Sequence, residues 1–234
     1  MDSATHASLI VRDRSFAAGA KKEIHWLALN AGFAQRKLDE IDIVVLELTS
    51  NLVKHARDGE ILAGIVHDRR SVMLELIGID SGPGIADPAR MMQDGVSTKG
   101  TLGHGLGTIR RLSDQFEIYS LKGWGTVVLI RIYLQKNDDP AAKRLPLILR
   151  SLIVAKPGEA VSGDGSYSFI AGDGTYRLLV ADGLGHGAEA NRAVREASLA
   201  FREIESDSPV DILRYIHSMI RKTRGIVAAV VVVD

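Results

Sequence analysis

Cysteine is absent from the 234-residue sequence. Disulfide bonds, thiolate zinc sites and thiol nucleophiles are therefore excluded, and any metal ion must be held by oxygen or imidazole ligands. An excess of either charge is absent too, because 29 Lys and Arg residues balance 29 Asp and Glu residues. Nucleic acid is therefore not expected as the main partner, and a phosphate ligand would be held by a local site.

Long apolar runs are also missing. No run approaches the roughly 20 residues that a membrane-spanning helix needs, and Met1, Asp2 and Ser3 do not begin a charged-then-apolar secretory signal. We therefore expect a cytoplasmic protein without a membrane partner. Hydrophobic residues make up 46% of the chain, which is enough for one large core or two modest ones.

The apolar periodicity predicts an α/β protein in two parts. In the first part, helical spacing predicts helices over residues 15–32, with Gly32 placed to end the helix, over 39–57 and over 108–115. Alternating β-branched segments predict a sheet behind these helices, with strands at 61–66, 71–79, 116–120 and 126–134. Beyond a Pro-containing interruption we expect strands at 147–155 and 176–181, helices at 188–203 and 209–221, and a buried strand at 226–233.

Glu47 and Asn51 are the first candidate functional residues. They are four positions apart on a predicted helix and therefore share one face. An amide oxygen suits Mg²⁺, and a carboxylate can take a proton from an attacking hydroxyl or water. The same pattern also fits a solvated helix edge.

Two glycine-containing segments provide the next signals. Asp80 directly follows a predicted strand and begins Asp-x-Gly-x-Gly, in which glycines let the backbone approach a ligand and the carboxylate can accept from an adenine amino group. An ordinary turn has the same pattern. The segment 100–107 is rich in glycine and opens a predicted helix, which makes it a candidate anion site. It lacks the Lys-Ser/Thr ending of a P-loop, and no strand leads into it as in a dinucleotide fingerprint.

Taken together, the motifs resemble a known family. Glu-x-x-x-Asn-x-x-Lys-His from Glu47, Asp-x-Gly-x-Gly from Asp80, Gly-x-Gly-Leu-Gly from Gly103 and the pair Gly125-Thr126 are similar to the four boxes of the GHKL (Bergerat) ATPases. The short spacing between the boxes resembles the small anti-sigma-factor serine kinases. The resemblance implies an ATP-binding α/β sandwich over residues 1–136, in which a mixed sheet is covered by helices.

The resemblance also implies roles for individual residues. Glu47 matches the general base, Asn51 the Mg²⁺ ligand, Asp80 the acid that reads adenine, and Thr126 the threonine that closes the adenine pocket. Residues 93–107 match the lid over ATP. The remaining ATP contacts that it implies are Lys54, His55, Gly82, Gly84, Thr98, Lys99, Gly103, His104, Gly105, Leu106 and Gly107.

The family resemblance implies a protein substrate as well. The expected phosphate acceptor is a serine on a small STAS-domain antagonist, and a sigma factor, a stressosome-like scaffold or a second copy of this chain are further expected partners. The alternative is a nucleotide-dependent switch that captures its partner without phosphorylating it. The intact pair Glu47 and Asn51 favours the kinase.

Residues 147–234, after a linker at 137–146, carry a different signal. Asp164 and Asp182 each stand beside glycine at a predicted strand end, which fits either a hard-cation site or two simple Asp-Gly turns. The segment from Pro157 through the run 181–187 resembles the start of a PPM-type, SpoIIE-like serine phosphatase domain of α/β/β/α architecture. The resemblance implies Mn²⁺ or Mg²⁺ ions held by Asp164, Asp182 and the Gly183 carbonyl.

We expect this phosphatase-like part to be incomplete. The later aspartates of the family's metal site have no counterpart before Asp234, so we expect no phosphatase activity from the chain as given. A chain that acts chiefly as a phosphatase is the third reading.

Overall fold

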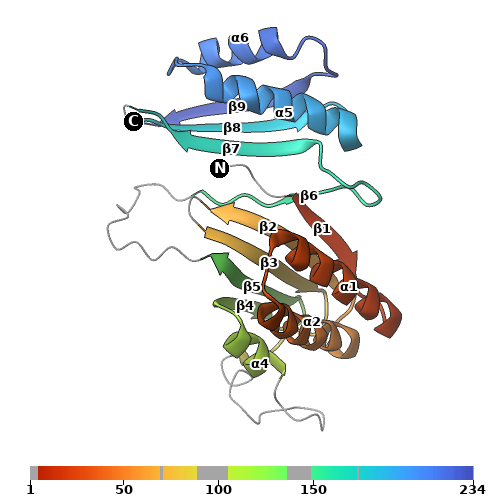
Figure 1. Ribbon diagram of the computed structural model, residues 1–234. Helices are drawn as coiled ribbons and strands as arrows, with labels where there is room; N and C mark the ends of the chain where they lie inside the picture. Colours follow the sequence, from red (N-terminus) through yellow and green to blue (C-terminus); the bar gives the residue numbers. More distant parts are fainter. Residues whose placement is uncertain (1–4, 69–70, 89–104, 136–148, 173, 234) are drawn as a thin grey trace. The chain divides into compact units, whose positions relative to one another are not determined.

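The computed structural model describes residues 5–68, 71–88, 105–135, 149–172 and 174–233 (Figure 1). The chain divides into two compact units by its internal contacts. One unit is Ser8–Val66 with Arg70–Asp138, and the other is Met1–Ala7 with His67–Arg69 and Asp139–Asp234. The predicted linker, 137–146, lies outside the described residues, and the predicted domain boundaries remain a prediction.

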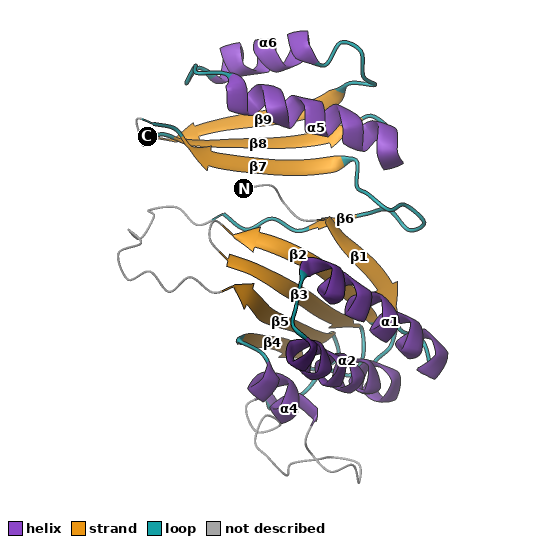
Figure 2. Cartoon of the chain, in the orientation of Figure 1, coloured by secondary structure: helices purple, strands orange, loops and turns teal. Residues whose placement is uncertain are grey.

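The first unit is a sheet covered on one face by helices (Figure 2). Its strands lie in the order β4-β5-β3-β2-β1. The strands are β1 (Thr5–Ile10), β2 (Glu60–Asp68), β3 (Ser71–Asp80), β4 (Gln115–Leu121) and β5 (Gly125–Gln135), and the helices are α1 (Arg14–Ala31), α2 (Gln35–His55) and α4 (Gly105–Leu112).

Local signals fix the ends of α1. Asp13 accepts hydrogen bonds from the backbone N–H groups of Ser15 and Phe16, at 2.7 and 3.2 Å, and so caps the N-terminus. Gly32 adopts a left-handed conformation with φ of 94° and ends the helix, as predicted. The prediction for α2 is confirmed as well, although the helix begins at Gln35, four residues earlier than expected.

The core of the first unit explains why α2 lies so close to the sheet. Leu48 is buried on the inner side of α2, and a Cβ placed on Gly78 of β3 would lie only 2.8 Å from its Cδ1 atom. Glycine at this position therefore lets the helix and the strand pack in direct contact. The buried apolar residues of α1, α2, α4 and the sheet form one continuous cluster.

The second unit pairs two helices with a three-stranded sheet. Its sheet order is β7-β8-β9, and a short β6 pairs in parallel with Thr5 and His6 of β1. The elements are β6 (Ile153–Val154), β7 (Asp164–Ile170), β8 (Tyr176–Gly183), α5 (Gly187–Glu203), α6 (Pro209–Met219) and β9 (Ile226–Val233). No helix among the described residues is both long and apolar enough to cross a membrane.

Several predictions for the second unit need correction. The strand expected at 147–155 is reduced to Ile153–Val154, because only these described residues find a pairing partner. β9 is not a buried strand: its side chains alternate, and Val227 is 66% exposed, because α5 and α6 cover one face of the sheet. The strand β1 was not predicted, and of β7 only a strand end at Asp164 was expected.

Candidate nucleotide-binding site

Helix α2 presents Glu47 and Asn51 one turn apart on a half-exposed face. An adjacent side of the helix is held in the core by Leu48 and Leu52, and the buried Thr49 donates a hydrogen bond to the Val45 carbonyl at 2.8 Å. The backbone that carries the two polar side chains is therefore rigidly supported. The shared face predicted from their spacing is confirmed.

Gly105, the first residue of α4, lies against both side chains. A Cβ on Gly105 would lie 3.3 Å from Asn51 Oδ1 and 3.3 Å from Glu47 Oε2. The fully buried Ile109 anchors α4 in the core, so the helix start cannot move away freely. The structure thus joins an acid, an amide and the positive end of a helix, three groups that sequence position alone does not bring together.

The start of α4 also fixes two further predicted residues. Leu106 packs against the core and Gly107 is buried, so both positions are part of the helix rather than of a loop before it. The helix begins three residues earlier than the predicted 108–115. The predicted contacts Thr98, Lys99, Gly103 and His104, and the lid from 93 to 104, lie outside the described residues.

Asp80 ends β3 directly opposite Thr126 of β5. Its Oδ1 atom accepts a hydrogen bond from the Gly82 N–H at 2.7 Å, which orients the carboxylate. A Cβ on Gly82 would lie 2.9 Å from the His55 carbonyl oxygen, so the loop after β3 packs directly on the end of α2. The strand register therefore brings Asp80 and Thr126 together. Gly82 is hydrogen-bonded to Asp80 and lies next to this pair.

The loop after β3 also docks on the β4–β5 turn. Gly84 has a φ of 71°, and any Cβ there would collide with the Leu121 carbonyl oxygen. The Gly123 N–H donates to the Pro83 carbonyl at 2.8 Å. Two turns that are distant in sequence thus form one wall, and glycine at position 84 permits their close approach.

Lys54 and His55 occupy the exposed last turn of α2. Basic side chains at a helix C-terminus stabilise the helix dipole, so their position alone does not require a ligand. Their predicted contact with phosphate stays a prediction.

Comparison with known proteins agrees with this geometry. Residues 16–132 match the histidine kinase-like ATPase domain. The chain belongs to this ATPase family. The GHKL resemblance of the first unit is therefore confirmed, whereas the fusion to a PPM-type domain stays a prediction.

Individual relatives of this ATPase domain are known. The serine/threonine-protein kinase RsbT of Bacillus subtilis (strain 168) is 38% identical over 102 residues, which cover 44% of this chain and 77% of RsbT. Two solved structures are slightly similar, each with a TM-score of 0.35. They are the mycobacterial sensor histidine kinase MprB, 18% identical over 41% of this chain and 71% of that chain, and the catalytic domain of histidine kinase ThkA, 14% identical over 54% and 97%.

Outside the ATPase domain, the predicted metal ligands lie side by side. Asp164 of β7 and Asp182 of β8 are direct register partners, and both are exposed. The adjacent Gly183 N–H donates to the Gly163 carbonyl at 2.9 Å. In the described parts of the chain no group of three His, Cys, Asp or Glu side chains could hold a metal ion. The predicted metal ligands are thus limited to two carboxylates and one carbonyl.

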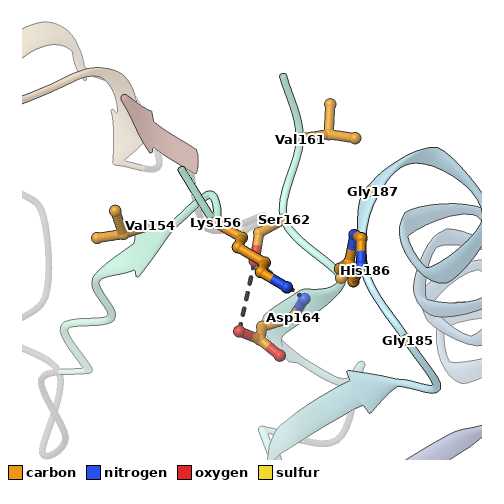
Figure 3. A pocket seen from close by; sticks show the side chains of 9 residues that line it. Val154, Lys156, Val161, Ser162, Asp164, Gly185, His186 and Gly187 are labelled. Atoms are coloured by element: carbon orange, nitrogen blue, oxygen red, sulfur yellow. Dashed lines mark hydrogen bonds between the residues drawn. The ribbon is translucent and has the colours of Figure 1, made fainter. Parts of the chain in front are cut away.

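A pocket of about 210 Å³ lies beside Asp164 (Figure 3). Lys156, Ser162 and His186 line it, and Ser162 donates a hydrogen bond of 3.4 Å to Asp164 Oδ2. His186 Nδ1 lies 2.5 Å from Glu159 Oε1. The Glu159–His186 pair was not predicted from the sequence, since Glu159 stands 22 residues before the run 181–187 and no local pattern links the two residues.

Proposed function

We propose that this chain is an ATP-dependent protein-serine kinase. The observation that carries the proposal is the meeting of Glu47, Asn51 and Gly105, in which a carboxylate and an amide oxygen both face the first residue of α4. Phosphoryl transfer needs a positioned metal ion, backbone amides for the phosphates and a base near the acceptor more than it needs a protein nucleophile. This chain offers an amide oxygen for the metal ion, backbone N–H groups and a carboxylate at one place.

The residues present fit ATP with Mg²⁺. Asn51 would offer its neutral oxygen to the metal ion, and the N–H groups from Gly105 to Gly107 would face the phosphates at a helix N-terminus. Lys54 and His55 would add positive charge on the phosphate side. Asp80 and Thr126 would contact adenine above Gly82 and Gly84, where side chains are excluded by the packing against His55 and Leu121.

Glu47 is proposed as the general base. Its side chain is half-buried rather than sequestered, so a serine hydroxyl from a partner can reach it. Bound ATP supplies the phosphoryl group, and Glu47 takes the proton of the attacking hydroxyl. A base in this position typically contributes about 10²- to 10⁴-fold to the rate.

The proposed substrate is a serine on a STAS-domain antagonist protein. The family resemblance supports a STAS-domain partner. The relative that is 38% identical over 102 residues is named a serine/threonine-protein kinase, which supports a hydroxyl side chain as the acceptor. A sigma factor or a stressosome-like scaffold would be a further partner in the same signalling complex.

The second unit is proposed to hold Mn²⁺ or Mg²⁺ weakly at Asp164, Asp182 and the Gly183 carbonyl. The direct pairing of the two aspartates across β7 and β8 supports this. A two-metal centre that activates water needs more carboxylates than these two. We therefore propose no phosphatase turnover by these residues alone.

The kinase is tested with labelled ATP and a purified STAS-domain antagonist protein. We expect label on one serine of that protein, and no label when this serine is replaced by alanine. The STAS protein could instead bind only in the presence of ATP and stay unlabelled. That result would favour a nucleotide-dependent binding switch over a kinase. Absence of ATP binding, measured by calorimetry with Mg²⁺, would overturn the nucleotide site itself.

A further inference from the structure

Ser120, the last but one residue of β4, joins the two turns that form the wall of the nucleotide site. Its hydroxyl oxygen lies 2.7 Å from the Ile85 backbone nitrogen, 3.0 Å from the Gly125 carbonyl oxygen and 2.9 Å from Thr126 Oγ1. Ser120 and Asp80 are both register partners of Thr126, so the three residues form one row across β4, β5 and β3. Residues directly opposite each other in antiparallel strands project from the same face.

The hydrogen bonds of Ser120 fix the direction in which Thr126 donates. A serine hydroxyl has one proton and two lone pairs. The Ile85 N–H occupies one lone pair, and the Gly125 carbonyl, which can only accept, takes the proton. The remaining contact is therefore donated by Thr126 to Ser120. The Thr126 oxygen is left with lone pairs alone.

Asp80 is an acceptor at the same end of the sheet. One carboxylate oxygen already accepts from the Gly82 N–H, and the second is an acceptor whenever the acid is ionised. Two neighbouring acceptors favour a ligand that carries an amino group and disfavour one that carries a carbonyl. Without Ser120, the Thr126 hydroxyl could rotate, and it could then accept from an amino group or donate to a carbonyl.

We propose that Ser120 is a positioning residue that makes the site selective for a 6-aminopurine over a 6-oxopurine. Ser120 acts through Thr126, from which it accepts a hydrogen bond, and through the Ile85 N–H, from which it also accepts, so that the loop after β3 stays against the β4–β5 turn. This inference rests on the proposed nucleotide site. It adds a determinant of base selectivity to that site.

The test compares ATP with inosine triphosphate, which carries the same phosphates but an oxygen in place of the 6-amino group. Dissociation constants are measured by calorimetry for the wild type, Ser120→Ala and Ser120→Thr. We expect Ser120→Ala to reduce the preference for ATP about tenfold, the effect of one misdirected hydrogen bond of about 1.4 kcal/mol. Ser120→Thr keeps the hydroxyl and should keep the preference.

Thr126→Val separates this role from a merely structural one. Thr126→Val removes the hydroxyl that donates to Ser120. The preference of this variant for ATP over inosine triphosphate should therefore fall as in Ser120→Ala. The double variant, with both substitutions, should show no further fall. If Ser120→Ala does not fold, Ser120→Cys takes its place in the comparison, because a thiol is only a weak hydrogen-bonding group. An unchanged ratio of the two dissociation constants in the folded variants overturns the inference while the ATP site stands. A wild type that binds neither nucleotide overturns the proposed site as well.

Discussion

Gly105 begins helix α4 against the carboxylate of Glu47, and a Cβ at residue 105 would lie 3.3 Å from Glu47 Oε2. That separation is tight for alanine and leaves no room for a branched side chain. The glycine therefore keeps open the space between an acid on one helix and the N–H groups at the start of another.

Gly105→Val should weaken the binding of ATP with Mg²⁺ by at least about tenfold, because the new methyl groups would occupy the space beside Glu47 and Asn51. Calorimetry measures the loss. Gly19→Val is the matched control: Gly19 lies on the exposed side of α1, with nothing within 4 Å of its Cβ position. An equal loss of binding in both variants would mean that the effect is on folding and not on the site.

Asp80→Asn should leave the fold intact and reverse the hydrogen-bonding polarity of the proposed adenine contact. The Gly82 N–H still needs an acceptor, so the amide oxygen takes the place of Oδ1 and the amide NH₂ replaces the second carboxylate oxygen. A donor would then face the 6-amino group of adenine. We expect ATP to bind more weakly and inosine triphosphate to bind more tightly than to the wild type. Unchanged affinities for both nucleotides would place the base elsewhere.

Asp182→Asn should stabilise the second unit in the absence of metal. Asp164 and Asp182 stand directly opposite each other, and like charges in that position destabilise a strand pair by about 0.2–1 kcal/mol. Thermal unfolding at low salt measures the gain in stability. Asp164→Asn should give the same gain, and a variant with both substitutions should be no more stable than either single variant.

Mn²⁺ provides the complementary measurement for this pair of aspartates. It should raise the unfolding temperature of the wild type and not that of Asp182→Asn. An equal rise in both proteins would show that the metal ion binds elsewhere. A loss of stability in Asp182→Asn without metal would contradict the repulsion.

The sequence predicted the parts of the fold that depend on local signals. Helix α1 follows from its apolar spacing and from Gly32, whose left-handed backbone ends it. β6 was predicted too long because its length depends on where the distant Thr5 and His6 pair with it. The extent of β7 was not predicted because Gly165, Ser166 and Ser168 have low strand propensity, and the strand forms only by pairing with β8.

In the candidate site, too, local features could be predicted from the sequence and features that depend on tertiary packing could not. The common face of Glu47 and Asn51 follows from their spacing on one helix, and the pattern after Asp80 marks a tight turn. That Gly105 meets both side chains of α2 depends on the packing of α4, which has no local signal. Ser120 could not be found from the sequence either, since its role arises from the register that places it opposite Thr126.

Glu47→Gln tests the proposed kinase most directly, because it removes the base and keeps the shape of the side chain. The measurement is the initial rate of label transfer from ATP to the STAS-domain protein, together with the dissociation constant for ATP with Mg²⁺. The matched control is Glu40→Gln on the same helix, where Glu40 pairs with Lys37 at 2.9 Å, away from Gly105. We predict unchanged ATP binding in both variants, and a fall in transfer of about 10²- to 10⁴-fold in Glu47→Gln alone. Transfer by Glu47→Gln at the wild-type rate would contradict the assignment of Glu47 as the base.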